Sequence, residues 1–334
     1  MVIHDELTPA TQPGITASCI DGKHCQRHID PDEAIKLIDV GKHVWIHLHY
    51  TDPDKAANFL EDKLHFHELA VEDALSPNER PSLTEYEGYI FLVVPALSRS
   101  SSATASDEWV EIGFFLSDHY LVSVADRDCP TVDFWLDRWS KHPLKEEMTT
   151  SDLLYELLDG VVDAYMPLID KIEDDVDAIA DNIFAGDKNK VYELLQIKRR
   201  LLEIRRRIGP FRDVINGLLR RDIDFIPESV RPYFQDIYEH TVRVSENVDL
   251  QRDTLTSLLD VHLSVVSNNL NEVMKKMTVI ATVLMTAALI AGIYGMNFSQ
   301  MPELHWKFGY PLAIGMMVVS SVGILIAFRW KKWI

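Results

Sequence analysis

Residues 277–297 read MTVIATVLMTAALIAGIYGMN, and the twenty residues up to Met296 contain no charged side chain. A helix needs ~20 apolar residues to cross ~30 Å of hydrocarbon, so this stretch is long enough to span a membrane. A second uncharged stretch, YPLAIGMMVVSSVGILIAF, occupies residues 310–328. A pair of buried core helices is the alternative, but Lys or Arg residues bound both stretches, which favours two transmembrane helices.

Two basic clusters flank the pair of stretches: Lys275 and Lys276 precede the first, and Arg329, Lys331 and Lys332 follow the second. Trp330 and Trp333 accompany the second group as interfacial anchors. Because cytoplasmic flanks are rich in Lys and Arg, we expect both basic clusters inside and residues 297–309 outside. The N-terminal segment MVIHDELTPATQPG is polar and does not read as a cleavable signal. These features predict a multi-pass protein of the inner membrane with both termini in the cytoplasm.

Charge is distributed unevenly along the chain. The 334 residues include 33 Lys and Arg against 52 Asp and Glu, a formal charge of −19. The first 273 residues carry about −24 of this charge, and the last 61 carry about +5. An acidic body argues against a nucleic-acid partner, since phosphate binding needs a surplus of Lys and Arg. Three Cys cannot form a disulfide framework, which indicates a reducing setting for the soluble part.

The N-terminal part predicts a mixed α/β domain. Short β-like runs at residues 43–49, 89–94 and 120–124 lie between helical and turn-rich stretches. His43, His47 and His49 share one face of the first run, and we interpret them as a partly exposed polar edge without a metal.

From about residue 150 the pattern becomes helical. Two apolar stripes with steps of three and four residues lie on either side of a break at 185–187, which predicts an antiparallel helical hairpin. The stripes are Leu154, Leu158, Val161, Tyr165, Leu168, Ile172, Val176 and Ile179, and then Leu194, Ile197, Leu201, Ile204, Ile208, Phe211, Ile215 and Leu218. A third helix from about Arg231 to Met296 would be on the order of 100 Å long. A helix of that length cannot pack alone, which indicates a homo-oligomer.

The expected fold class is therefore α+β, with long α-helices and two C-terminal transmembrane helices after the α/β domain. The expected parts are the cytoplasmic α/β domain (1–149), the helical hairpin (150–226), the cytoplasmic part of the stalk helix (227–276), transmembrane helix 1 (277–296), an extracytoplasmic loop (297–309), transmembrane helix 2 (310–328) and a basic cytoplasmic tail (329–334).

Gly295-Met296-Asn297 closes the first apolar stretch, and the segment MPELHWKFGYP follows at residues 301–311. Here the sequence resembles the CorA family of divalent-cation channels, in which Gly-Met-Asn ends the first of two C-terminal spans and a short loop often contains Met-Pro-Glu-Leu. The likeness covers the chain from about residue 65 onward. It includes NEVMK at 271–275, LDV at 259–261, PYF at 232–234 with Asp236 and His240, and VED at 71–73 with Arg80-Pro81.

The resemblance implies a homopentameric funnel whose first spans line a pore, with a selectivity filter at Gly295, Met296 and Asn297. Family position and helical spacing together indicate a pore face, which contains Asn271, Met274, Met277, Ala281, Met285, Ala288 and Gly292. An uncharged constriction of this kind can gate by dewetting. For the three Met residues, lipid contact or helix packing is the alternative. Thr286 and Ala288 stand where family members often have Pro and Thr, so a ring of pore-facing hydroxyls is missing.

The filter residues suit a strongly hydrated ion. Mg²⁺ dehydrates reluctantly, and conduction needs binding weak enough to release the ion. Five Asn297 amides would offer neutral oxygens to the waters around Mg²⁺, and Gly295 would permit a close approach. The alternative for Asn297 is a helix C-cap. Glu303 in the outer loop would add a ring of negative charge that concentrates cations.

A second set of residues concerns regulation. The family senses cytoplasmic Mg²⁺ through carboxylates that bridge neighbouring subunits, and the matching positions are Asp73 and Asp236, with Glu72 and Asp159 beside them. Bound divalent ions would offset the repulsion between acidic bodies and favour a closed state. The alternative is that these residues are ordinary acids of helix surfaces.

We therefore expect a Mg²⁺ channel that also passes Co²⁺ or Ni²⁺, with the ion itself, the membrane and other copies of the chain as its partners. The sequence contains no phosphate-binding Walker loop and no evident nucleophile–base pair, so we expect no enzyme. Two alternatives remain open. One is a zinc transporter on the same scaffold, although the zinc branch typically has a residue other than Met between Gly and Asn. The other is a membrane-anchored metal sensor that conducts nothing.

Overall fold

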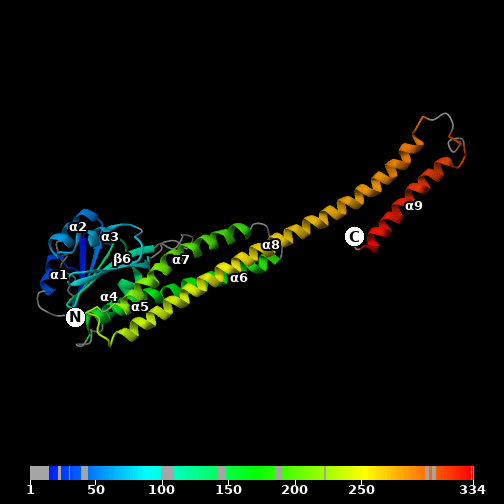
Figure 1. The fold of residues 1–334 in the computed structure, drawn as a ribbon. Helices are drawn as coiled ribbons and strands as arrows, with labels where there is room; N and C mark the ends of the chain where they lie inside the picture. Colours follow the sequence, from blue (N-terminus) through cyan, green and yellow to red (C-terminus); the bar gives the residue numbers. More distant parts are fainter. Residues whose placement is uncertain are drawn as a thin grey trace, which may run out of the picture. The chain divides into compact units, whose positions relative to one another are not determined.

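The computed structural model of the chain (Figure 1) describes residues 15–21, 24–29, 31–38, 44–77, 79–98, 109–141, 148–184, 190–221, 223–297, 301–302, 306–331 and 333. The chain divides into two compact units. The first comprises residues 1–179 and 189–255, and the second comprises residues 180–188 and 256–334.

A seven-stranded sheet forms the centre of the first unit, with strand order β2-β1-β3-β7-β6-β5-β4. Only β3 and β7 pair in parallel, and the other neighbouring strands pair antiparallel. The strands are β1 (Ile15–Asp21), β2 (His24–Ile29), β3 (Val44–Tyr50), β4 (Ser82–Tyr86), β5 (Tyr89–Leu97), β6 (Trp109–Leu116) and β7 (Tyr120–Ala125). The three strands expected from sequence are β3, β5 and β7, and the other four strands carry weaker patterns.

Helices cover both faces of this sheet (Figure 1). Val44, Ile46 and Leu48 of β3 pack in one core with side chains of α2 and α3. Trp45 points to the opposite face, where its ring makes an edge contact with Trp139 of α4 at a centroid distance of 5.3 Å. Because both faces are buried, the central strands read as nearly continuous apolar runs. The helices of this part are α1 (Pro31–Ile38), α2 (Pro53–Asp62), α3 (Glu68–Leu75) and α4 (Pro130–Lys141).

The expectation that the histidines mark a sheet edge is wrong. Strand β3 lies inside the sheet between β1 and β7, and His47 is buried. Its Nδ1 lies 2.9 Å from Oγ of Ser123, and the same oxygen accepts a 2.8 Å hydrogen bond from the indole N–H of Trp45. Burial, with a smaller contribution from His49, lowers the pKa of His47 to about 3, so the ring is neutral at physiological pH. His43 lies outside the described residues.

The helical region begins with α5 (Thr150–Asp163), α6 (Tyr165–Phe184) and α7 (Lys190–Arg220). Both apolar stripes predicted for the hairpin are buried along their whole length. The first stripe is divided between two helices, because the helix breaks at Ala164. Thr149 begins α5 with a capping box, in which its hydroxyl oxygen accepts from the amide of Asp152 and the Asp152 carboxylate accepts from the amide of Thr149.

Helix α8 (Arg231–Tyr294) is a single helix of 64 residues, and it ends two residues before the predicted end. A buried stripe that includes Phe234, Ile237, Val244 and Val248 packs it into the first unit. From residue 259 to residue 278, every described side chain of α8 is partly or fully exposed.

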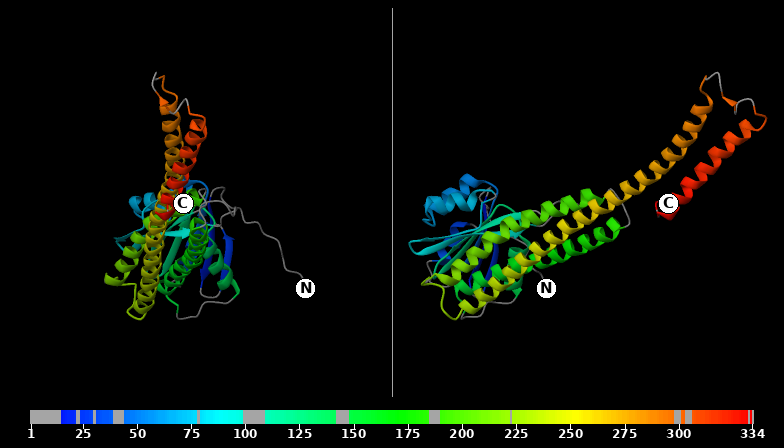
Figure 2. Two further views of the ribbon diagram at one scale, coloured as in Figure 1. Left: turned by 90° about the vertical axis from the view of Figure 1, so that its right-hand side faces the viewer. Right: turned by 45° about the vertical axis from the view of Figure 1, so that its right-hand side comes forward.

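Helix α9 (Gly309–Trp330) runs back along the C-terminal part of α8 within the second unit (Figure 2). The end of α8 and the helix α9 are both long and apolar enough to cross a membrane. In the most apolar 18 residues of each helix, only 6% of the residues are buried within the single chain. Apolar surface on this scale needs lipid or another protein chain to cover it.

Candidate functional site

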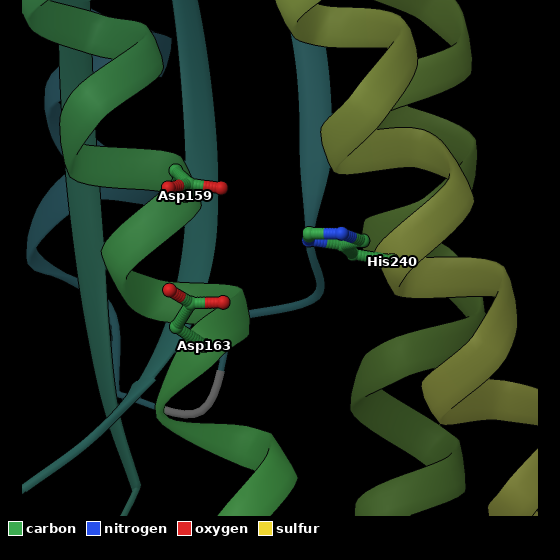
Figure 3. Close-up of side chains that lie close together, drawn as sticks. All are labelled: Asp159, Asp163 and His240. Carbon is green, nitrogen blue, oxygen red and sulfur yellow. The ribbon is translucent and has the colours of Figure 1, made fainter.

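Three side chains of the first unit bring ligand atoms together. Asp159 and Asp163 lie one turn apart on α5, so they occupy the same face of that helix. His240 lies on α8 and faces them (Figure 3). One atom from each of the three residues lies within 4.8 Å of the others. Among the described residues, this is the one group of three or more His, Cys, Asp or Glu side chains with such spacing. We call it the α5–α8 trio.

The trio is partly enclosed and strongly negative. Asp159 and His240 are half-buried, and Asp163 is exposed. Burial raises the pKa of Asp159, and the carboxylates of Asp163 and Asp236 raise it further, whereas His240 acts in the opposite direction. The charges that shift this pKa are thus two carboxylates and one imidazole, with no Lys or Arg among them. A bound cation would relieve the repulsion between these carboxylates.

The same field acts on a neighbouring phenol. Burial raises the pKa of Tyr155 to about 12, and Asp159, Glu156 and Asp236 add to the effect. The Tyr155 ring lies beside the ring of Tyr233, at a centroid distance of 5.1 Å. This region of α5 and α8 therefore disfavours any additional negative charge.

Asp236 lies next to the trio. Its Oδ1 is 3.8 Å from Nε2 of His240, one helical turn further along α8. This distance is longer than a hydrogen bond.

The remaining predicted regulatory residues lie elsewhere in the unit. Glu72 and Asp73 belong to α3, and burial raises the pKa of Asp73, with Glu79 and Glu72 contributing. Neither residue belongs to the α5–α8 trio. Of the predicted regulatory set, the structure brings Asp159 and Asp236 close to His240, and it keeps Glu72 and Asp73 on a separate helix.

Two trio members were not among the predicted site residues. His240 is part of the family resemblance only, and no motif of the sequence distinguishes Asp163. The available signal was the spacing of four residues in Asp159–Asp163 and in Asp236–His240, which places each pair on one helix face. Only the packing of α5 against α8 reveals that the two pairs meet.

The predicted pore residues lie together on one side of α8. All seven, from Asn271 to Gly292, are exposed in the single chain. Met274, Met277 and Met285 expose 64%, 60% and 70% of their surface. A Cβ added at Gly292 would meet nothing within 4 Å. The side of α8 that contacts the rest of the second unit is the opposite one, where Val279 is buried and Val283, Ala287 and Ile290 are partly covered.

The three predicted filter residues follow the end of α8 directly. The amide of Gly295 donates a 2.9 Å hydrogen bond to the Ala291 carbonyl, and an added Cβ at Gly295 would lie 3.1 Å from that oxygen. Asn297 is exposed. It does not have the positive φ of a left-handed helix cap, since His65 is the only described residue other than Gly with that conformation. Glu303 lies outside the described residues.

Three threonines in the first span bond to their own helix. Thr278, Thr282 and Thr286 each donate a hydroxyl hydrogen bond of 2.7–2.8 Å to the carbonyl four residues earlier. Thr286 is also partly covered on the side away from the predicted pore face. It therefore does not replace the hydroxyl that is missing at Ala288.

Comparison with known proteins identifies relatives along nearly the whole chain. The family described as "CorA-like Mg2+ transporter protein" matches residues 40–332. The cobalt/magnesium transport protein CorA of Thermotoga maritima is 33% identical over 311 residues, which cover 91% of this chain and 87% of the relative.

A structure of the CorA magnesium transporter from Methanocaldococcus jannaschii superimposes with a TM-score of 0.82 and 22% identity, over 96% of this chain and 99% of that one. A more distant sequence relative is the zinc transport protein ZntB of Yersinia enterocolitica, which is 23% identical over 315 residues and 94% of both chains.

Proposed function

The chain belongs to the CorA-like Mg²⁺ transporter family, and we propose that it works as a homopentameric channel through which Mg²⁺ enters the cytoplasm. Co²⁺ or Ni²⁺ would pass by the same route. The entry needs no chemical energy source, since a divalent ion gains ~4.6 kcal/mol per 100 mV of membrane potential. The channel would lie in the inner membrane with both termini in the cytoplasm, as the basic flanks of the two spans indicate.

The observation that carries this proposal is the exposed, uncharged face of α8. Met274, Met277 and Met285 are among its most exposed side chains, and they point away from the side that packs within the chain. Five copies of α8 that meet on this face would enclose an apolar conduit with Gly292 near its outer end. Small and thioether side chains at that seam let the helices approach closely, and such a conduit opens and closes by wetting.

Asn297 supplies the polar contact at the mouth of this conduit. Five exposed amides would bind the waters of a hydrated ion through neutral oxygens. A ring of carboxylates at the same place would hold the ion more tightly and slow its release. The loop that contains Glu303 would add negative charge outside the membrane and raise the local cation concentration.

Regulation by cytoplasmic Mg²⁺ is the second part of the proposal. Glu72 and Asp73 on α3 and Asp159 and Asp236 on α5 and α8 form two acidic groups that are separate within one chain. An ion held between the first group of one subunit and the second group of its neighbour would join the subunits. Acidic bodies that repel one another would separate when the ion leaves, and the closed state would lose its support.

Ion uptake into liposomes that contain the purified protein tests the function. Mg²⁺, Co²⁺, Ni²⁺ and Zn²⁺ are compared under an inward gradient, with Asn297→Ala as the filter variant. We expect Mg²⁺ uptake by the unaltered chain and at least tenfold slower uptake by Asn297→Ala. Equal uptake by both proteins would contradict the role of Asn297, and no uptake of any ion would leave a non-conducting membrane-anchored sensor as the function.

Zinc transport on the same scaffold is the second candidate. It is favoured by the relative from Yersinia enterocolitica that carries the name of a zinc transport protein. Met296 between Gly295 and Asn297 argues for Mg²⁺ instead, since the resemblance to the magnesium branch includes this residue. In the same uptake series, Zn²⁺ flux that exceeds Mg²⁺ flux at equal concentration would decide for the zinc transporter.

A further inference from the structure

We infer that a groove between the two membrane helices α8 and α9 holds one acyl chain of an anionic phospholipid, and that Lys307 binds the phosphate of its headgroup. The lipid belongs to the leaflet on the side of residues 297–309, which is the side expected outside the cytoplasm. The inference goes beyond the proposed function, because it concerns a lipid and not an ion.

The groove lies within the second unit, where α9 runs beside the end of α8 (Figure 2), and it has a volume of about 600 Å³. Ile290 forms its wall on α8. The residues on α9 are spaced by four along one face of the helix. They are Pro311, Leu312, Gly315, Met316, Val319 and Ser320. None of these residues is charged, so the lining suits a hydrocarbon chain.

Gly315 keeps the groove open. It has no side chain, and a Cβ added at this position would meet nothing within 4 Å. Val319, one turn further along α9, exposes 73% of its surface. The one hydroxyl of the lining, on Ser320, already donates to the carbonyl oxygen of Met316 at 2.7 Å. The groove therefore presents no unsatisfied side-chain donor that would call for water or a polar ligand.

The length of the groove matches one leaflet of a bilayer. Pro311 and Ser320 are nine residues apart, which is ~14 Å along a helix. Half of the ~30 Å hydrocarbon core is ~15 Å. Ile290 stands near the end of α8 at Tyr294, and Pro311 stands near the start of α9 at Gly309. The groove thus begins at the membrane surface on the side of residues 297–309 and ends near the middle of the bilayer.

The position of Ile290 favours lipid over a second copy of the chain as the occupant, and this step rests on the proposed function. Ile290 lies on the partly covered side of α8, opposite the exposed side that contains Met285 and Gly292. Copies of the chain would meet on that exposed side. The α8 wall of the groove is therefore turned away from the contact between copies.

Lys307 provides the complementary charge for an anionic headgroup. It is exposed, and it is the only Lys or Arg in residues 297–309. No acidic residue lies in the first turn of α9, which starts two residues later. The rings of Trp306 and Phe308 on either side of Lys307 are in contact, at a centroid distance of 6.0 Å. Trp side chains collect at the level of lipid headgroups, and a Lys at this level can reach a phosphate.

Native mass spectrometry of the full-length protein in detergent tests the site. Bound lipids are counted after addition of phosphatidylglycerol or phosphatidylethanolamine with the same acyl chains. We expect one tightly bound phosphatidylglycerol per subunit. Phosphatidylethanolamine should bind about fivefold more weakly, which is the effect of one Lys near an anionic lipid surface. Lys307→Gln should remove this preference and leave both lipids bound with the weaker affinity.

A variant that fills the groove tests the acyl-chain site itself. Gly315→Leu should bind both lipids at least tenfold more weakly, because its side chain takes the place of the acyl chain. Gly323→Leu is the matched control, since Gly323 lies on the same helix in equally open space and does not line the groove. Circular dichroism and elution volume verify folding. If Gly315→Leu does not fold, Val319→Phe fills the same groove, with Val318→Phe as its control.

Three results would overturn the inference. The first is equal lipid binding by the groove-filling variant and its control. The second is a preference for phosphatidylglycerol that persists in Lys307→Gln. The third is a changed elution volume of Gly315→Leu with an unchanged lipid count, which would assign the groove to a neighbouring copy of the chain. Because lipid binding is measured without any ion flux, these results are decisive whether or not the chain conducts Mg²⁺.

Discussion

The Asp236 carboxylate and the His240 imidazole lie 3.8 Å apart on successive turns of α8. The two side chains face different partners. His240 faces Asp159 and Asp163 of the same chain, whereas the Asp236 carboxylate is largely exposed. One turn of helix thus presents an imidazole and a carboxylate to different surroundings, and variants at the two positions should have separable effects.

The first prediction concerns the gate. The double variant Asp73→Ala, Asp236→Ala should conduct Mg²⁺ even when internal Mg²⁺ is high, because each of the two acidic groups at the predicted subunit junction then keeps only one of its two carboxylates. The measurement is current or uptake as a function of internal Mg²⁺. Glu85→Ala, at an exposed position of β4, is the matched control and should leave inhibition unchanged. Full inhibition of the double variant would refute the sensor.

The second prediction concerns the pore face. Cys introduced at Met285, which is 70% exposed, should place five thiols around the conduit. Cd²⁺ should then reduce flux at least tenfold, because several thiolates can bind one soft ion. Val283→Cys is the control, since Val283 is partly covered on the opposite side of α8. Equal block of both variants, or of neither, would show that the assignment of the pore face is wrong.

The third prediction concerns the packing of α5 against α4. A Cβ added at Gly160 would lie 2.8 Å from Nε1 of Trp135 and 2.9 Å from Cγ2 of Thr131, and both groups are part of the packed contact between α4 and α5. Gly160→Ala should therefore lower the free energy of unfolding by about 1–3 kcal/mol, the usual cost of overpacking a core.

Gly217→Ala is the control for this packing effect. Its added Cβ would meet only the flexible end of Leu83, which can rotate away, so its effect should be near zero or slightly stabilising. Urea unfolding of both variants in detergent makes the comparison. The packing argument fails if Gly160→Ala is as stable as Gly217→Ala.

The fourth prediction concerns pH and stability. The pKa of His47 is about 3 in the folded chain, whereas its ordinary value is 6.5. Between pH 3 and pH 6.5, His47 therefore binds a proton in the unfolded chain but not in the folded chain. The contribution of His47 to the free energy of unfolding is fully present above pH 6.5. It decreases as the pH falls below 6.5, by at most ~1.4 kcal/mol per pH unit. The free energy of unfolding should thus depend less on pH in His47→Gln between pH 6 and 5.

The exposed His119 provides the comparison for this effect. His119→Gln should keep the pH dependence of the unaltered chain, because its ring is largely in solvent. If His47→Gln and His119→Gln give the same slope, burial of His47 is not the source of the dependence.

The sequence predicted best what depends on local pattern. Helix α8 is expected from Arg231 to Met296, and in the structure it begins at Arg231 and ends at Tyr294. The bounds agree this closely because an uninterrupted apolar stripe and a terminal Gly are strong signals of a helix and of its end. The break at Ala164 was missed, since Ala favours helices and the apolar stripe continues through Tyr165. The interior place of β3 was missed because strand order depends on contacts between distant segments.

For the candidate sites, too, local pattern could be predicted from the sequence and contacts between distant segments could not. Residues on one helix face, such as Met274 and Met285, could be grouped from spacing alone. The approach of His240 to Asp159 and Asp163 could not, because it depends on how α8 packs against α5. The sequence contains both pairs of ligands at helical spacing, but the contact between the pairs is a property of the tertiary fold.

The hydroxyls of Thr278, Thr282 and Thr286 have a consequence for biogenesis. Each hydroxyl is already bonded to a carbonyl of its own helix, so it has no need of water when the segment leaves the translocon. The nascent segment partitions into lipid as if it carried methyl groups at these positions. Insertion therefore requires no partner chain to shelter these polar atoms.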